Sequence, residues 1–540
     1  MTGCATPGRP PHPAATLLGA LRADRPRLRD GLAILLPFGL YLRTLAPTIY
    51  NLDSAELSTA AATGGILRAT GYPLYLTLGW LWTRLPIGDV GYRMNLLSAV
   101  SGAATILLAD RILRRLRVGP LASAGALGLL AVAPAFWSMS LVAEVYTLQT
   151  LLMAGLILAL LRWAEAPLAP GRAAGLGLLL GLALCHHAAT ALLLPGLGVF
   201  VAVAAPEALR RPRLWAAGVL GLAIGLTPLV YLPLRYAAAP AFNYAGAFDA
   251  AGRFQPVDLS RPAGILWLMS GRSFAGQMFG YGPTATLTEL WRLLVQLNRA
   301  FLGVGLGPGL LGAVLLYRRH RPIGLLLGLF FAANGLFFAA YRVVDKATMY
   351  LPVYLVWALW AGLGYQALLD WVAGRRDRGA EPAPGLEAGQ ARAAAVRGRP
   401  GSSWPRAGNL LGAGLLVAVL AGLRLTWPLA DRSGDVSARL RGERLLAAAE
   451  PNALVLGWWD TVPVLQYLQL VEGRRPDILA INRFLIPSEA LDALLRRELG
   501  RRPIYVDSVP GSLAGAVAVS QADLFLRLRP APPPRQGRSR

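Results

Sequence analysis

The sequence from Gly31 to Glu56 reads GLAILLPFGLYLRTLAPTIYNLDSAE, and the rest of the chain is organised around it. Its first part, Gly31 to Pro47, is apolar and approaches the roughly 20 residues that an α-helix needs to cross a bilayer. Two carboxylates, Asp53 and Glu56, follow this run, and residues three apart share one face of a helical turn. Charges beside a membrane are costly to keep without a role. The stretch therefore predicts a membrane span that ends in an acidic pair at the membrane edge.

The composition is typical of a polytopic α-helical membrane protein. Of the 540 residues, 55% are hydrophobic and 15% are charged, whereas soluble domains carry about 25% charged residues. The formal net charge is +24. The arginines flank apolar runs, which is the pattern of cytoplasmic loops under the positive-inside rule. The positive charge therefore indicates membrane topology, and nucleic acid is not expected as a partner.

The sequence contains few features of a cofactor enzyme. Its two cysteines, Cys4 and Cys185, predict neither a disulfide framework nor a metal site. Dinucleotide-binding, P-loop and CxxC motifs are absent from the sequence, so nothing supports nucleotide hydrolysis or a redox cofactor. A divalent metal held by Asp53 and Glu56 stays open as an alternative, although the pattern does not require one.

The arginine distribution predicts about eleven spans, with the N-terminus in the cytoplasm and the C-terminus outside the cell membrane. Residues 71–86 are expected to lie in the membrane interface and not to cross it. Beyond Arg432, strand-like runs at 453–457, 476–481 and 503–507 alternate with helical patterns, which predicts a small α/β domain with a parallel sheet. The expected organisation, in chain order, is a basic cytoplasmic tail (1–30), a transmembrane region (31–373) with outer loops at 48–93 and 236–299, a flexible cytoplasmic linker (374–406), a last transmembrane helix (407–428), an extracytoplasmic α/β domain (432–528) and a disordered tail (529–540).

Under this topology, many isolated polar residues fall on the outer side of the membrane, in the loops that flank the acidic pair. Convergent polar groups in a shared cleft are the usual sign of a site. Each has a simpler alternative, such as an arginine that reaches for lipid phosphate or a histidine that satisfies a break between helices. The candidates for donor-phosphate or substrate binding are Arg93, Glu144, Tyr146, His186, His187, Arg235, Asn243, Arg272, Asp345 and Lys346.

Acids and bases at one membrane face suit group transfer from a lipid-linked donor. An acceptor hydroxyl needs a carboxylate to take its proton as it attacks the anomeric carbon of a sugar. The leaving phosphate needs arginine, lysine or histidine donors for its growing charge. Attack from the face opposite the phosphate would invert the anomeric centre.

A set of motifs in fixed order resembles a membrane family related to protein O-mannosyltransferases, within the glycosyltransferase C (GT-C) superfamily. The likeness runs from about residue 40 to residue 485. Its motifs are Leu45-Ala-Pro47, Asp53-Ser-Ala-Glu56-Leu57, Gly71-Tyr-Pro-Leu-Tyr75, Arg93-Met-Asn95-Leu-Leu-Ser98, Trp137-Ser138, Glu144-Val-Tyr146-Thr-Leu148, Cys185-His-His187, Tyr231-Leu-Pro-Leu-Arg235, Pro240-Ala-Phe-Asn243-Tyr244, Trp267-Leu-Met-Ser-Gly271-Arg272, Asp345 with Tyr350-Leu-Pro352, Leu468-Gln469, Glu472-Gly473 and Arg475-Pro-Asp477.

This resemblance implies a GT-C-like fold, a polyprenyl-phosphate sugar donor, plausibly of mannose, and an external acceptor such as Ser/Thr hydroxyls of proteins. It makes Asp53 the expected base and Glu56 its companion. The chain departs from the family where His-Pro-Pro is usual and Arg68-Ala69-Thr70 stands here. It departs again at Asn243-Tyr244, where members often have Asn-Trp.

Two other classes of function remain as alternatives. A transporter or flippase of lipid-linked sugars would place polar residues along a midplane pathway and show inverted repeats, and the sequence shows neither pattern. A non-catalytic membrane scaffold would need its C-terminal domain and not Asp53.

Overall fold

The computed structural model describes residues 26–51, 53–343, 346–373, 404–513, 517–522 and 525–531. The predicted N-terminal tail and flexible linker lie largely outside these residues, as does the candidate Asp345. The predicted disordered tail also lies mostly outside them, but Arg529 and Pro530 belong to a strand, so the tail prediction is wrong for these two residues.

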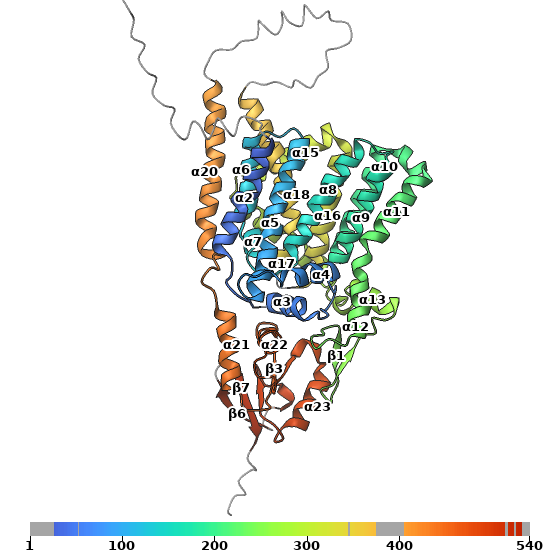
Figure 1. Cartoon of the computed structure of the whole chain (residues 1–540). Helices are drawn as coiled ribbons and strands as arrows, with labels where there is room; N and C mark the ends of the chain where they lie inside the picture. The colour runs from blue at the N-terminus through green and yellow to red at the C-terminus, as the bar shows by residue number, and fades with distance from the viewer. Residues whose placement is uncertain are drawn as a thin grey trace, which may run out of the picture.

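The described chain forms a helical bundle, a thin layer of short helices beneath it, and a C-terminal domain below that layer (Figure 1). Six described helices have the length and hydropathy to cross a membrane, which makes this a multi-pass membrane protein. The predicted count of eleven crossings stays a prediction. The bundle helices are α2 (Pro26–Thr44), α5 (Val90–Arg115), α6 (Pro120–Val132), α7 (Pro134–Met139), α8 (Tyr146–Ala164), α9 (Pro170–His186), α10 (Leu194–Ala204), α11 (Pro212–Gly225), α12 (Tyr231–Ala237), α15 (Leu306–Arg319), α16 (Arg321–Ala340), α18 (Leu351–Val372) and α20 (Trp404–Ala430).

Charged groups inside the bundle are paired, as a low-dielectric interior requires. Asp110 on α5 is 4% exposed, and Arg29 of α2 lies 2.8 Å from its carboxylate. The Ser123 hydroxyl donates a further hydrogen bond of 2.6 Å to Asp110. This network connects α2, α5 and α6 at the end of the bundle far from the acidic pair.

Glycines allow α9 and α11 to pack backbone against backbone. A Cβ atom added to Gly221 would lie 2.0 Å from the Ala174 carbonyl oxygen, and one added to Gly177 would lie 2.0 Å from that of Gly218. Small residues permit such close approach between membrane helices, where dispersion forces supply much of the attraction.

We expect Gly221→Leu to separate α9 from α11 and to destabilise the protein by at least about 1–3 kcal/mol, because overpacked side chains must shift the backbone. Gly175→Leu is the matched control, since a Cβ at Gly175 meets no atom within 4 Å. Thermal unfolding in detergent measures both variants. Equal melting temperatures for the two would contradict the packing account.

The layer beneath the bundle contains α3 (Asp53–Thr63), α4 (Pro73–Trp82) and α17 (Lys346–Met349) (Figure 1). A proline at the first position starts α4. At ten residues, α4 spans about 15 Å, which is too short to cross a bilayer. Its Trp80 and Leu81 side chains are exposed. The interfacial position predicted for residues 71–86 stays a prediction that this geometry favours.

The second loop region has more structure than its mixed sequence suggests. It contains a hairpin of β1 (Gly246–Phe248) and β2 (Phe254–Pro256), and then α13 (Pro262–Met269), η4 (Arg272–Phe274) and α14 (Pro283–Ala300). On α14, one face buries Glu289, Leu293 and Leu297. This helix therefore carries a buried carboxylate toward the underside of the bundle.

The C-terminal domain contains α21 (Ser437–Ala448), α22 (Val462–Leu470) and α23 (Ser488–Glu498) around a five-stranded sheet of order β4-β3-β5-β7-β6. The strands β3 (Leu454–Gly457), β4 (Leu479–Asn482) and β5 (Ile504–Val506) are parallel. The predicted parallel sheet is wrong for β6 (Val517–Ala522) and β7 (Phe525–Pro530), which are antiparallel. Two residues separate β6 from β7, and so short a connection allows only antiparallel pairing.

The domain packs directly on the acidic helix. Ala55 of α3 and the neighbouring Ile49 share a buried apolar cluster with Tyr467 and Leu468 of α22. The Gly91 amide donates a 3.3 Å hydrogen bond to the Tyr467 hydroxyl. The first loop and the C-terminal domain therefore meet at α3 and α22.

Candidate active site

The acidic pair begins α3 (Asp53–Thr63), where the positive end of the helix dipole favours negative charge. The two side chains differ in exposure. The Asp53 side chain is 29% exposed, and Glu56 is 2% exposed. The Asp53 carboxylate is therefore accessible to solvent, whereas the Glu56 carboxylate is enclosed by protein.

Arg68 joins the two carboxylates. Its Nη2 atom lies 2.6 Å from Asp53, and its Nε atom lies 3.3 Å from Glu56. The described hydrogen bonds of this guanidinium use Nε and Nη2. No described hydrogen bond involves Nη1.

Two predicted site residues hold the loop that carries Arg68. Arg235 donates from Nε to the Gly64 carbonyl oxygen, at a glycine whose φ of +63° favours this residue type. Ile66 forms a parallel bridge with Asn243, and the Tyr231 hydroxyl donates a 2.7 Å hydrogen bond to the Gly65 carbonyl oxygen. Arg235 and Asn243 thus contact the loop backbone.

An aromatic group surrounds the guanidinium. The Arg68 Cζ atom lies 4.5 Å from the Trp459 ring centroid and 5.6 Å from that of Phe274. Phe484 stacks on Phe274 at 5.6 Å and meets Trp459 edge-on at 4.8 Å. The Trp459 indole also donates a 2.7 Å hydrogen bond to Asp53 Oδ1.

Burial and neighbouring charge tune this cluster in opposite directions. Burial raises the pKa of Glu56 to about 7, opposed by the Arg68 charge and reinforced by that of Asp53. Burial would lower the pKa of Arg68, but the charges of Asp53 and Glu56 hold it well above its ordinary value. Arg68 therefore stays cationic while Glu56 titrates near neutral pH.

The two histidines lie beside the tyrosine that follows the Arg68 loop. The ring centroids of Tyr72 and His187 are 5.5 Å apart, and those of Tyr72 and His186 are 6.5 Å apart. His186 Nε2 lies 2.8 Å from the Val145 carbonyl oxygen. His187 Nδ1 accepts a 3.0 Å hydrogen bond from the Ala189 amide. The structure thus brings both histidines to the first loop, with one nitrogen of each engaged by backbone.

Tyr146 connects this region to a second group of charges. Its hydroxyl hydrogen-bonds the Thr348 side chain, and the charges of Glu144 and Asp53 act on it. Glu144 is buried, and its backbone N–H donates a 3.2 Å hydrogen bond to the Ser98 hydroxyl oxygen. Both predicted residues therefore lie within electrostatic range of the acidic pair.

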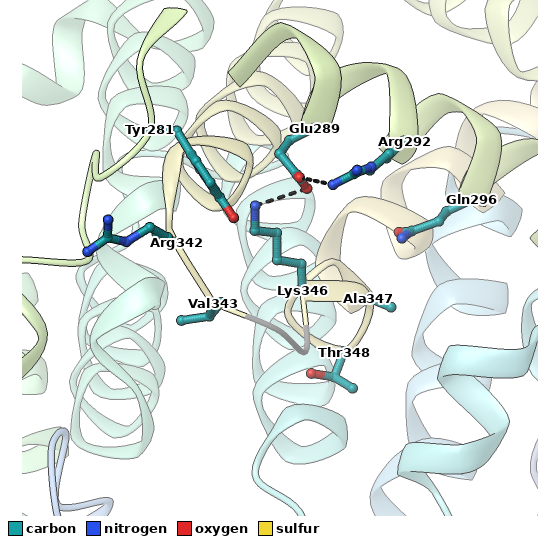
Figure 2. A pocket seen from close by; sticks show the side chains of 9 residues that line it. All are labelled: Tyr281, Glu289, Arg292, Gln296, Arg342, Val343, Lys346, Ala347 and Thr348. Atoms are coloured by element: carbon teal, nitrogen blue, oxygen red, sulfur yellow. Dashed lines mark hydrogen bonds and ion pairs between the residues drawn. The ribbon is translucent and has the colours of Figure 1, made fainter. Parts of the chain in front are cut away.

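Thr348 belongs to a cavity of about 500 Å³ that lies under α16. Lys346 is 5% exposed, and its Nζ atom lies 2.9 Å from Glu289 and 4.1 Å from the ring centroid of Tyr281. Figure 2 shows Arg292 on the same Glu289 carboxylate and Arg342 on the other side of the cavity. Three cations thus face this cavity against one described carboxylate.

Two candidates lie apart from these clusters. Arg93 donates to the carbonyl oxygens of Ile87 at 2.7 Å and Gly88 at 2.9 Å, so it closes the turn after α4. Arg272 is exposed in η4. No described contact brings either side chain to Asp53, and Asp345 lies outside the described residues.

Sequence reasoning missed Arg68, Trp459, Tyr281 and Glu289. Arg68 was visible in the sequence as a departure from the usual His-Pro-Pro, in the same loop as two acids. Trp459 lies 406 positions from its partner Asp53, and no local pattern announces such a contact.

Arg68 bridges the acidic pair and places one positive charge between its two carboxylates. The described residues contain no group of three or more histidine, cysteine or acidic side chains suited to hold a metal ion.

Comparison with known proteins bears on the segment that carries this site. Residues 53–210 match the family model described as "Protein O-mannosyl-transferase TMEM260 N-terminal domain". Over these residues, the predicted relationship to protein O-mannosyltransferases is confirmed. The mouse Protein O-mannosyl-transferase TMEM260 is 32% identical over 204 residues, which are 36% of this chain. The match spans only 28% of the length of that relative.

Solved structures share the fold over almost the whole chain. ArnT from Cupriavidus metallidurans, bound to undecaprenyl phosphate, aligns with a TM-score of 0.57 and 16% identity over 93% of this chain and 97% of its own. The archaeal oligosaccharyltransferase AglB from Archaeoglobus fulgidus, in complex with an inhibitory peptide and a dolichol-phosphate, gives 0.51 and 14% over 92% and 69%. At these identities the likeness establishes the GT-C-like fold, as the sequence predicts.

The raised pKa of Glu56 predicts a pH-dependent stability. Its folded value of about 7 exceeds the ordinary 4.5, so the folded protein holds a proton that the unfolded chain releases between these values. Stability should therefore fall as pH rises from 4.5 to 7 and level off above. Glu56→Gln cannot titrate and should lack this slope. Melting temperatures in detergent test the difference, and parallel curves for the two proteins would refute it.

Proposed function

We propose that this protein is a membrane glycosyltransferase that moves a sugar from a polyprenyl-phosphate donor to an external acceptor hydroxyl, with inversion. The observation that carries the proposal is the half-exposed Asp53, bridged by Arg68 to a buried Glu56 at the underside of the bundle. It supplies an acceptor for a proton and donors for a phosphate within one cluster.

In this reaction the acceptor oxygen bonds to the anomeric carbon while the bond from that carbon to the donor phosphate breaks. The hydroxyl proton passes to Asp53, and the bonding electrons leave with the polyprenyl phosphate. Asp53 is the more exposed acid and is the base. Glu56 sits behind it and orients Arg68.

Two groups of cations suit the leaving phosphate. Arg68 offers Nη1 beside the base, and guanidinium groups bind phosphate with strong charge-assisted hydrogen bonds. Lys346 and Arg342 line the adjoining cavity (Figure 2). The Tyr146–Thr348 contact places the cavity next to the acidic pair, so a phosphate can lie between Arg68 and Lys346. Preorganised donors of this kind stabilise charge as it develops.

The names of the relatives support a more specific proposal for the sugar and the acceptor. The matched family and the mouse relative are named as protein O-mannosyltransferases, which supports mannose and protein Ser/Thr hydroxyls. ArnT was solved with undecaprenyl phosphate and AglB with a dolichol-phosphate, which supports a polyprenyl carrier. The partners are thus the lipid-linked donor, a protein or glycan acceptor, and the membrane lipids around the bundle.

The positive-inside rule supports the orientation that this reaction needs. Arg111, Arg114 and Arg115 lie at the end of α5 far from the acidic pair, which suits the cytoplasmic side. The layer with α3 and the C-terminal domain then lie outside the cell membrane, where an external acceptor arrives.

We expect Asp53→Asn to reduce transfer by about 10²–10⁴-fold, the factor that a general base typically contributes. The assay is transfer by purified protein from a panel of polyprenyl-phosphate sugars to Ser/Thr-rich peptides, read by mass spectrometry. Asp258→Asn is the control, because Asp258 is 45% exposed and pairs locally with Arg261. Full activity of Asp53→Asn would remove Asp53 from the mechanism.

Lys346→Gln should weaken donor binding and raise the donor KM by about tenfold or more, because a hydrogen bond to a charged group contributes about 1.5–3 kcal/mol. Arg299→Gln, an exposed site on α14 outside the cavity, should leave the donor KM unchanged. If the two variants behave alike, the cavity is not the phosphate site.

A further inference from the structure

The side chain that ties the C-terminal domain to the acidic pair is Trp459. It follows β3 and precedes α22, at the carboxyl end of a parallel strand. The packing of α22 on α3 brings this turn beneath the first loop (Figure 1). The indole N–H then donates a 2.7 Å hydrogen bond to Asp53 Oδ1.

This contact has a different character from the rest of the interface between α3 and the C-terminal domain. Docking is already provided by the buried cluster of Ile49 and Ala55 with Tyr467. The only polar atom of the Trp459 side chain instead hydrogen-bonds a carboxylate. The ring centroid lies 4.5 Å from the Arg68 Cζ atom. One side chain therefore contacts both members of the principal ion pair.

The hydrogen bond determines something that the ion pair leaves open. Arg68 Nη2 lies 2.6 Å from both Oδ1 and Oδ2 of Asp53, so it holds the carboxylate group without distinguishing its oxygens. A second donor on Oδ1 fixes the rotation of the carboxylate plane. Among the described contacts, Oδ2 then accepts from Arg68 alone.

Neighbouring rings make Trp459 a stiff support. Phe484 packs edge-on at 4.8 Å, and Tyr244 lies 5.9 Å away by ring centroids. A cation is attracted to an aromatic face, so the same ring also resists movement of Arg68 away from the acids.

We propose that Trp459 is a positioning residue of the reaction, which orients the Asp53 carboxylate through its indole N–H and holds Arg68 through its ring. The C-terminal domain then contributes a side chain to the catalytic centre. This inference rests on the proposed function, because it acts through Asp53 as base.

The test compares Trp459→Phe with Trp458→Phe in the purified full-length protein. Phenylalanine keeps a ring near Arg68 but removes the N–H, so kcat should fall about 10–100-fold, while the KM values for donor and acceptor stay within twofold. Trp459→Leu removes the ring as well and should fall further. Trp458 is 47% exposed and lies over Arg483, so Trp458→Phe should retain wild-type kcat.

Asp53→Asn, measured alongside, separates the two levels of the account. Fully active Asp53→Asn removes Asp53 as the base and with it the positioning role, whereas the absence of transfer by the wild-type protein from every donor overturns the proposed function itself. Inactive Asp53→Asn with fully active Trp459→Phe overturns only the positioning role. A rise in KM at unchanged kcat would make Trp459 a substrate-binding residue and also overturns it. Melting temperatures and limited proteolysis check domain docking, and a kcat loss accompanied by undocking would assign Trp459 to structure alone.

Discussion

The ion pair of Arg68 with Asp53 and Glu56 is the interaction on which the layer beneath the bundle and its contact with the C-terminal domain depend. Two carboxylates on one helical turn repel each other, and the burial of Glu56 adds a desolvation cost. A guanidinium between them offsets both costs while it keeps the pair in place. Removing Arg68 would leave a buried, uncompensated acid, which is strongly destabilising in proteins.

Much of the surrounding structure holds that one guanidinium. Arg235 and Tyr231 of α12 donate hydrogen bonds to the backbone that precedes Arg68. Phe274 from the second loop and Trp459 from the C-terminal domain cover its faces. Side chains from three separate parts of the chain therefore surround the Arg68 loop and its guanidinium. Through this convergence the C-terminal domain, more than 400 positions along the chain, contacts the acidic pair of the first loop.

Local pattern was enough to predict part of this arrangement. Asp53 and Glu56 follow an apolar run directly, and the arginine distribution placed them with the other polar loops. The positions of Arg235, Asn243 and the histidines near the first loop agree with that expectation, although their roles stay predictions. Arg93 shows the limit of the approach, because its carbonyl contacts close a local turn.

The rest depended on tertiary packing that no local pattern contains. Arg68 contacts the acidic pair only when its loop folds back on α3. Trp459 does so only when α22 packs on α3. Glu289 lies on the buried face of α14, in a region whose mixed sequence suggested a loop. The strands β6 and β7 escaped prediction because strands that continue a parallel sheet in antiparallel order, with β6 at its edge, carry a weaker signal than the buried strands β3 and β5.

A structure of the protein in a lipid nanodisc with a polyprenyl phosphate tests the central claim most directly. The account predicts that the phosphate lies between the Arg68 Nη1 atom and the Lys346 cavity, within reach of Asp53 for an acceptor placed opposite. A phosphate bound away from both Arg68 and Lys346, for example against Arg93, would contradict it.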